Sequence, residues 1–226
     1  MCGRYASFRQ AQELADIFTV DVVSPVAAGI APSWNVAPTT PVRLIYEMAI
    51  DGQLFRTLDA AAWGLVPTWA KDRSLGARLI NARSETVAEK PSFRGPLAYS
   101  RCVVPMEGYY EWQAASDGKQ PYFISATDGA PLAAAGLYSL WKDELLTCTI
   151  LTRAARPGLA RIHDREPVFL SHISTWLNPS VRDRAEAAAL LNGPTPELTA
   201  RPVARTVNSV RNNGPDLIAP AGTQAT

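Results

Sequence analysis

Short runs of β-branched and aromatic residues, each bounded by turn signals, most constrain how this chain can fold. Asp51-Gly52, Asp117-Gly118 and Asp128-Gly129 separate such runs, and Asp-Gly is a favoured turn between antiparallel strands. The predicted strands are 42–46, 54–58, 102–104, 109–113, 122–125 and 146–151. Meanders and hairpins are therefore expected, not βαβ units.

Helical patterns lie near the two ends of the chain. Ser7 is predicted to cap a helix through Phe18, because apolar residues fall there at the i, i+3, i+4, i+7 spacing. Short helices are also predicted over 171–177 and 181–191, the second ending at Asn192-Gly193.

Residues 24–41 lie between the first predicted helix and the first predicted strand. They include four prolines and are predicted to form a structured loop. The resulting fold class is α+β, a single domain over 1–218 with mostly antiparallel strands in a barrel- or sandwich-like core and peripheral helices. Residues 219–226 are expected to form a flexible C-terminal tail.

The charge balance excludes a broad attraction to duplex DNA, because 22 basic and 21 acidic residues leave a net charge of +1. Any nucleic-acid binding must be local. Between Leu65 and Pro105, three acidic residues stand against seven basic ones, for a net charge of +4. The basic residues are Lys71, Arg73, Arg78, Arg83, Lys90, Arg94 and Arg101. This segment is the candidate basic patch, and an ordinary solvated face is the alternative.

The sequence offers no sign of a membrane span, because no stretch approaches the roughly 18 apolar residues that one needs. A cytoplasmic monomer is expected, or a nuclear one in a eukaryote. Cys2, Cys102 and Cys148 lie far apart and, with two histidines, lack metal-site spacing. No disulfide, metal or cofactor is expected. Cys102 and Cys148 fall in strand-like runs and are predicted to be core residues.

Cys2 becomes chemically distinctive if Met1 is removed, as happens when the second residue is small. A free N-terminal cysteine carries an α-amine of pKa about 7.7–8.0 beside a thiol of pKa about 8.5. An aldehyde condenses with such an amine to an imine, and the sulfur then closes a five-membered thiazolidine. An incidental cysteine in a floppy terminus is the alternative.

Further segments bear on that choice. In chain order they are Met1-Cys2-Gly3-Arg4-Tyr5, Asn35-Val36-Ala37-Pro38, Trp63-Gly64-Leu65-Val66-Pro67-Thr68-Trp69, Asn81-Ala82-Arg83-Ser84-Glu85-Thr86, Gly108-Tyr109-Tyr110-Glu111-Trp112, Ile162-His163-Asp164-Arg165-Glu166-Pro167-Val168 and Val207-Asn208. Together, over Cys2 to about Ile218, they resemble the SRAP family, the SOS response-associated peptidases that bind abasic sites.

The resemblance implies catalytic roles for four residues. Cys2 would be the thiazolidine partner of the ring-opened sugar, Asn81 would orient its thiol or amine, and Glu111 and His163 would carry protons. Glu111 lies in an apolar aromatic stretch where burial would raise the pKa of its carboxylate, and Glu107 is the competing candidate.

The resemblance also implies a DNA-binding set. Arg83 and Arg4 would contact phosphate. Trp69 lies in a proline-rich loop next to the basic segment, and an exposed indole there would suit stacking on an unpaired base or wedging beside it, whereas Trp63 is expected in the core. Thr152, Asn35 and Asn208 match polar positions that line the family's pocket. His172 is expected at the surface, and Glu166 departs from the methionine found in many relatives.

The function implied is a sensor that crosslinks through Cys2 to abasic sites in single-stranded DNA and shields them, associated with the nucleoid after DNA damage. Weak strand cleavage by β-elimination through the imine is a further activity that the same chemistry allows. The peptidase label implies autoproteolytic removal of Met1, and aminopeptidase action is the alternative. Two other readings remain: an N-terminal-cysteine glutamine amidotransferase, and a noncatalytic single-strand-binding module.

Overall fold

The strands and helices of the chain are those of a computed structural model that describes residues 2–222. The strands are β1 (Tyr5–Ser7), β2 (Val22–Val23), β3 (Ser33–Val36), β4 (Pro41–Ile50), β5 (Gln53–Trp63), β6 (Asn81–Arg83), β7 (Arg101–Met106), β8 (Gly108–Ala115), β9 (Gly118–Ala126), β10 (Leu132–Trp141), β11 (Leu145–Ala154), β12 (Arg165–Pro167) and β13 (Leu198–Pro202). The α-helices are α1 (Ala11–Phe18), α2 (Pro25–Ala28), α3 (Arg94–Tyr99), α4 (Pro157–Ala160), α5 (Ile173–Leu177) and α6 (Arg184–Ala189). Short 3-10 turns are η1 (Arg73–Arg78), η2 (Leu190–Asn192), η3 (Arg205–Asn208) and η4 (Pro215–Ile218).

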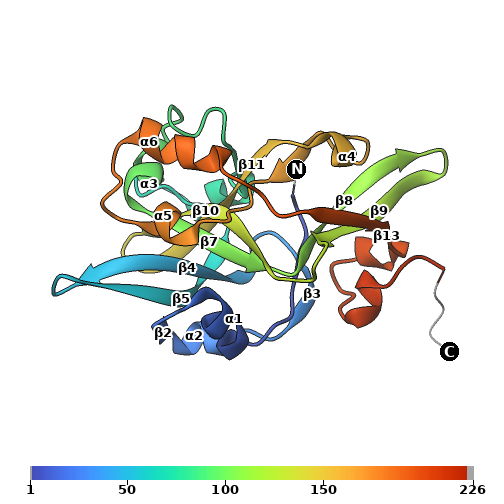
Figure 1. The fold of residues 1–226 in the computed structure, drawn as a ribbon, viewed down its shortest axis with the longest axis horizontal. Helices are drawn as coiled ribbons and strands as arrows, with labels where there is room; N and C mark the ends of the chain where they lie inside the picture. Colours follow the sequence, from blue (N-terminus) through green and yellow to red (C-terminus); the bar gives the residue numbers. More distant parts are fainter. Residues whose placement is uncertain (1, 223–226) are drawn as a thin grey trace.

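The larger sheet has the strand order β12-β11-β10-β7-β4-β5-β2 and curls into a ring, because β11 also pairs with β5 in parallel. This sheet contains a long hairpin, in which β4 and β5 pair from Pro41↔Ala62 to Ile50↔Gln53 and which projects at one end of the molecule (Figure 1). Asp51 and Gly52 both have positive φ at the tip, as the predicted two-residue turn requires. The predicted α+β class with mostly antiparallel strands in a barrel- or sandwich-like core is confirmed, the larger sheet being a ring and not a true barrel.

The smaller sheet has the order β13-β9-β8-β1-β3, and residues of both sheets share one buried cluster between them. Successive side chains of a strand point to opposite faces of the sheet, so neighbouring residues join different hydrophobic clusters. Val103 of β7 packs against the helices, whereas Cys102 on the same strand packs between the two sheets. On β8, Tyr109 faces the layer between the sheets and Tyr110 faces the opposite side, against Phe123. The layer between the two sheets contains Cys2.

The N-terminal helix and the segment after it differ from the sequence predictions. Ser7 does not cap α1, because it is the last residue of β1; Gln10 is the cap, in a capping box with Glu13. Residues 24–41 are not only loop. Ser24 caps α2 with Pro25 at its first turn, and Ser33–Val36 joins the smaller sheet as β3 at its edge.

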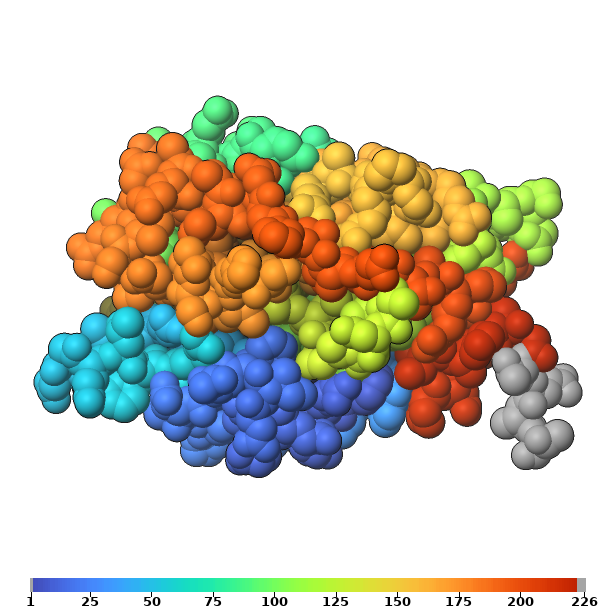
Figure 2. Space-filling model, in the orientation of Figure 1, coloured from blue at the N-terminus to red at the C-terminus, as the bar shows by residue number. Residues whose placement is uncertain are grey.

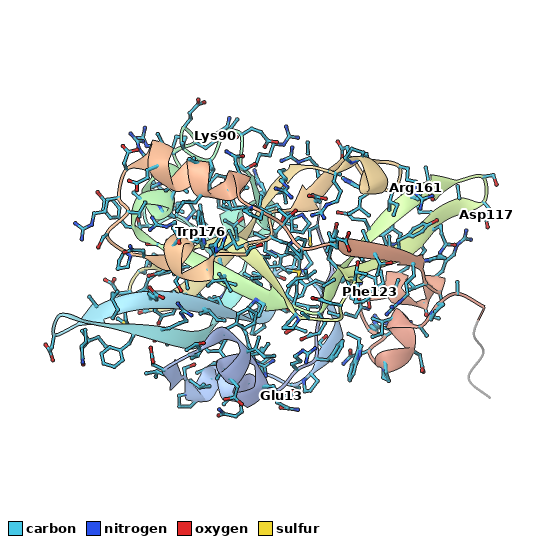
Figure 3. The ribbon with its side chains drawn as sticks, viewed as in Figure 1. Glu13, Lys90, Asp117, Phe123, Arg161 and Trp176 are labelled. Atoms are coloured by element: carbon cyan, nitrogen blue, oxygen red, sulfur yellow. The ribbon has the colours of Figure 1, made fainter. Side chains whose placement is uncertain are left out.

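The helices α3, α5 and α6 cover one end of the larger sheet (Figure 1). Trp176 of α5 is fully buried and points into this end of the molecule, donating from Nε1 to the carbonyl of Cys102 (Figure 3). The predicted helices over 171–177 and 181–191 are present as α5 and as α6 followed by η2.

The expected C-terminal tail lies partly outside the described residues, since 223–226 are not described. Before them, Ala221 N donates to Pro202 O, and Leu217 is buried against the outer face of the smaller sheet. Within residues 2–222, no helix is long and apolar enough to cross a membrane.

Candidate active site

Strand pairing brings the N-terminal residues alongside β8. Tyr5 pairs with Tyr109, and Tyr110 N donates to Arg4 O at 2.9 Å, so the two segments run antiparallel. Continued by two residues, the same register places Cys2 beside the stretch that contains Glu111. Cys2 is fully buried between the sheets.

Asn81 holds the backbone of Cys2. It begins β6, which pairs in parallel with β11 at Ile150, and its Nδ2 donates to the Cys2 carbonyl at 2.7 Å. Its other amide atom, Oδ1, is buried and accepts no hydrogen bond within the described part of the chain. A buried acceptor without a donor is costly, so Oδ1 is positioned to accept a hydrogen bond from a group added at the site.

Glu111 faces the same layer as Cys2, because it lies two residues after Tyr109 on β8. Its side chain is 4% exposed. Burial raises the pKa of the Glu111 carboxyl to about 7, where it can both donate and accept a proton near neutral pH.

His163 follows α4, which begins with Pro157, and stands across from Glu111. Its Nε2 lies 3.9 Å from Glu111 Oε2. Burial lowers the pKa of His163, which keeps the imidazole mostly neutral at pH 7.

The Cys2 thiol is kept protonated. Burial raises its pKa most, and the negative charge of Glu111 raises it further. Sulfur chemistry at this position therefore depends on a neighbouring group that takes the thiol proton.

Glu107, the competing acid, lies outside this cluster. Its Oε2 accepts from Phe8 N at 2.7 Å, and its Oε1 lies 3.5 Å from Arg9 Nε. It ties the chain after β1 to the β7–β8 connection. Burial raises the pKa of Glu107 as well, so a shifted pKa alone would not have separated the two acids.

The polar residues expected to line the pocket are engaged within the protein. Arg4 Nη1 donates to Asn35 Oδ1 at 2.8 Å and to Val207 O at 3.0 Å, and Asn35 Nδ2 donates to Ser209 O at 2.9 Å. Asn208 Oδ1 accepts from Trp112 Nε1 at 2.7 Å. These contacts fasten the segment after β13 against β3 and β8.

Thr152 is buried on β11, where it pairs with Arg83 of β6. Its Oγ1 donates to Ala82 O at 3.4 Å, and its carbonyl accepts from Arg165 Nη2 at 2.7 Å. The fully buried Cys102 and Cys148 and the fully buried Trp63 confirm the predicted core positions.

The candidate basic patch is mostly on the surface. Arg83, two residues after Asn81, is exposed, and Trp69 is 60% exposed. Residues 85–95 and 155–165 lie next to each other along one edge of the molecule (Figure 2), where Lys90 points outward (Figure 3). Arg165 links them with a bidentate ion pair to Glu85.

Arg101 corrects the prediction for the patch. It is 5% exposed, and its guanidinium donates to backbone carbonyls around the end of α5 and α3, so it is not a surface cation. The acceptors are Trp176, Leu97, Ala98, Val181 and Asn178. Its role is to join the helices to β7.

No function was predicted for the charged residues Asp164, Arg165 and Glu166, which directly follow His163. Asp164 Oδ1 lies 2.9 Å from His163 Nδ1, and Arg165 N donates to the same nitrogen at 3.0 Å. Glu166 is buried and forms ion pairs with Arg153 and Arg156, which neutralise its charge. The run of charges directly after the histidine was the signal that could have drawn attention to these positions.

In the part of the chain that the structure describes, no group of His, Cys, Asp or Glu side chains is arranged to hold a metal ion. The chemistry that the arrangement offers is that of a buried cysteine, an amide, a carboxyl of raised pKa and an imidazole.

Comparison with known proteins gives consistent matches over nearly the whole chain. Residues 1–210 match the family described as SOS response associated peptidase (SRAP). The abasic site processing protein YoqW of Bacillus subtilis (strain 168) is 38% identical over 226 residues, covering 96% of this chain and 99% of that protein. The abasic site processing protein YedK of Escherichia coli (strain K12) is 34% identical over 229 residues, covering 97% and 100%.

A crystal structure of a protein from Bacteroides thetaiotaomicron superposes with a TM-score of 0.82 at 27% identity, covering 97% of this chain and 100% of that one. The family match, the relatives and the fold thus agree over the segment that builds the site. The chain belongs to the SOS response associated peptidase (SRAP) family.

Proposed function

We propose that this protein processes abasic sites, forming a covalent bond between Cys2 and the ring-opened sugar in single-stranded DNA. The relatives YoqW and YedK carry the name abasic site processing protein. The observation that carries the proposal is the meeting of Cys2, Asn81, Glu111 and His163 from four separate segments.

The reaction begins once Met1 is removed, by the protein itself or by an aminopeptidase, because the nitrogen of Cys2 is otherwise part of a peptide bond. The freed amine attacks the aldehyde carbon, and the carbonyl oxygen leaves as water to give an imine. The thiol then adds across the C=N bond: sulfur bonds to carbon and the thiol proton goes to nitrogen, closing a thiazolidine.

Each proton transfer has a neighbouring group. The thiol has a raised pKa, so it needs a base, and the Glu111 carboxylate is the charge that acts on it most directly. Protonated Glu111 or His163 can supply the proton with which the hydroxyl leaves as water. Asn81 Oδ1 can accept from the Cys2 amine, which would satisfy its buried lone pairs.

Recognition of DNA needs few contacts to bases, because only a lost base provides the aldehyde. Arg83 would contact phosphate and Trp69 would stack on an unpaired base, both from exposed positions. The bonded strand is shielded from cleavage, a role in the DNA damage response. The imine also permits weak β-elimination. We propose that the protein acts as a monomer.

The test is incubation with abasic and intact single-stranded oligonucleotides, followed by a denaturing gel and mass spectrometry of the junction peptide. A band retarded only with the abasic strand, with the adduct on Cys2, is expected. Noncovalent binding to both strands would favour a single-strand-binding module, and glutamine hydrolysis without an adduct would favour an amidotransferase.

A further inference from the structure

Two groups compete for one ring nitrogen of His163. Arg165 N lies 3.0 Å from Nδ1 and can only donate to it, whereas Asp164 Oδ1 lies 2.9 Å from the same Nδ1 and, as a carboxylate, can only accept from it. The Asp164 side chain is 85% exposed, so it is in contact with water. Nδ1 satisfies one of these partners at a time, according to whether it carries a proton.

The choice at Nδ1 decides what the other nitrogen can do. With a proton on Nδ1, held by Asp164, the neutral ring has a lone pair on Nε2, which faces Glu111 Oε2 at 3.9 Å. With Nδ1 accepting from Arg165 N, the neutral ring carries its proton on Nε2 instead. The first state makes Nε2 a base and the second makes it an acid.

We propose that Asp164 is a positioning residue that selects the Nδ1-protonated tautomer of His163 and so makes Nε2 the base that faces Glu111. Its bearing on crosslinking rests on the proposed function, whereas the tautomer itself does not. The arrangement follows the logic by which a carboxylate behind an imidazole fixes the tautomer and stabilises the imidazolium.

The exposed Asp164 carboxylate lies at the solvent end of a proton-transfer path that starts at the buried Glu111 and passes through the His163 ring. A proton given by the Glu111 carboxyl to Nε2 makes an imidazolium whose Nδ1–H bonds Asp164. Loss of that Nδ1 proton to water leaves the ring neutral with the proton on Nε2, and Arg165 N then donates to the vacated Nδ1. Nδ1 has a hydrogen-bond partner in each form of the ring: Asp164 when it is protonated, and Arg165 N when it is not.

Other charges act on the ring from several sides. Glu111 of β8 faces Nε2, Lys119 of β9 acts as a nearby positive charge that lowers the pKa of His163, and the negative charge of Asp164 raises it. Asp164 is the exposed carboxylate among them, so it can be changed without opening the core.

The direct test is nitrogen NMR of the imidazole rings, which is simple because the chain has two histidines and His172→Gln assigns the other signal. Above its pKa, His163 should be mainly protonated on Nδ1 in the unaltered protein. In Asp164→Asn and Asp164→Ala the balance should move toward Nε2, and the His163 titration should shift down by about 0.2–0.7 pH unit, as for an exposed ion pair.

Asp143→Asn is the matched control, because Asp143 is an exposed aspartate in the β10–β11 turn with a φ of 57°, which asparagine tolerates. It should leave both readouts unchanged. The proposal would be overturned if neutral His163 were mainly protonated on Nε2 in the unaltered protein. It would also be overturned if both Asp164 variants kept the tautomer and the titration of the unaltered protein.

A second readout links the tautomer to reaction. Crosslinking by Asp164→Asn should slow about tenfold, with the limb of the pH–rate profile that belongs to His163 moved to lower pH and intact-strand affinity unchanged. Equal crosslinking rates in Asp164→Asn and the unaltered protein would show that Asp164 does not contribute to the reaction. Should the unaltered protein not crosslink at all, the proposed function would fail while the NMR test still decides the tautomer.

Discussion

Glu111 Oε2 and His163 Nε2 lie 3.9 Å apart, and the carboxyl is far more buried than the imidazole, with side-chain exposures of 4% and 29%. Burial raises the pKa of Glu111 to about 7 and lowers that of His163. Both shifts favour the neutral form of the group. Near neutral pH the Glu111 carboxyl can therefore act as an acid toward the neutral imidazole of His163, which can act as its base.

Glu111→Gln should remove this titration and stabilise the fold at high pH. A carboxyl whose folded pKa is raised favours folding fully below its unfolded value of about 4.5. That contribution is lost as pH rises through about 7. Relative to the variant, the free energy of unfolding of the unaltered protein should fall by about 2–3 kcal/mol between those pH values.

Denaturant unfolding of both proteins at a series of pH values measures this difference, with Glu144→Gln as a control at an exposed glutamate. The same variant should slow crosslinking by roughly 10²–10⁴-fold with intact-strand affinity unchanged. Parallel stability curves for unaltered protein and variant would mean that the folded pKa of Glu111 is ordinary.

Trp69 and Trp63 form a natural pair for separating binding from folding. Trp69→Ala should weaken single-strand binding by about 1–3 kcal/mol through lost stacking. Its stability should change by no more than about 0.5 kcal/mol, since the ring is 60% exposed. Trp63→Ala should instead destabilise the fold by about 3–5 kcal/mol, because the ring is fully buried and Nε1 donates to Ile80 O.

Fluorescence titration with an intact oligonucleotide and thermal unfolding report the two effects. Single-strand affinity that stays at the unaltered level in Trp69→Ala would show that bases do not stack on this indole.

Arg83 and Arg4 should differ although both were predicted to meet phosphate. Arg83→Ala should weaken binding to abasic and intact strands alike and reduce the salt slope by about 0.7, the value for one single-strand phosphate contact. Arg4→Ala should also lower stability by about 1–3 kcal/mol, because it leaves Asn35 Oδ1 without its donor and removes one of the two donors to the Val207 carbonyl, of which Asn35 Nδ2 remains.

Binding over a range of salt concentrations, with unfolding measured in parallel, distinguishes the two arginines. A loss confined to the abasic strand in Arg83→Ala would place that residue in the chemistry instead.

The parts of the fold that local pattern specifies were predictable, and those that depend on distant partners were not. The strands with aromatic and β-branched residues were found, though the predicted ranges were too short, since the polar residues Glu47 and Asp59 continue β4 and β5 beyond the predicted ends. Strand β10 was missed because Ala133, Ala134 and Ala135 carry no β-branched signal, although β10 is held centrally between β7 and β11.

The site shows the same division. Motifs identified Cys2, Asn81, Glu111 and His163, and the structure places them together. Charge alone could not show that Arg101 is buried, because its partners are carbonyls of residues up to 80 positions away. The same holds for Arg4, whose acceptors come from β3 and η3.

Blocking or replacing Cys2 separates the amine from the thiol. A chain that retains an extra residue ahead of Cys2 has no free amine there, so it should form no adduct at all. Cys2→Ser keeps the amine after Met1 is removed but lacks the sulfur. It should form an imine or a weaker oxazolidine that borohydride traps and that heat releases.

Cys148→Ala is the matched control, because Cys148 is a fully buried thiol in the same layer between the sheets but lies on β11, and the free amine remains. Once its stability has been measured, it should crosslink as the unaltered protein does. Denaturing gels with and without borohydride, before and after heating, give the readout. Heat-stable adducts in Cys2→Ser at the unaltered yield without reduction would rule out the thiazolidine, and adducts in the extended chain would rule out the imine that precedes it.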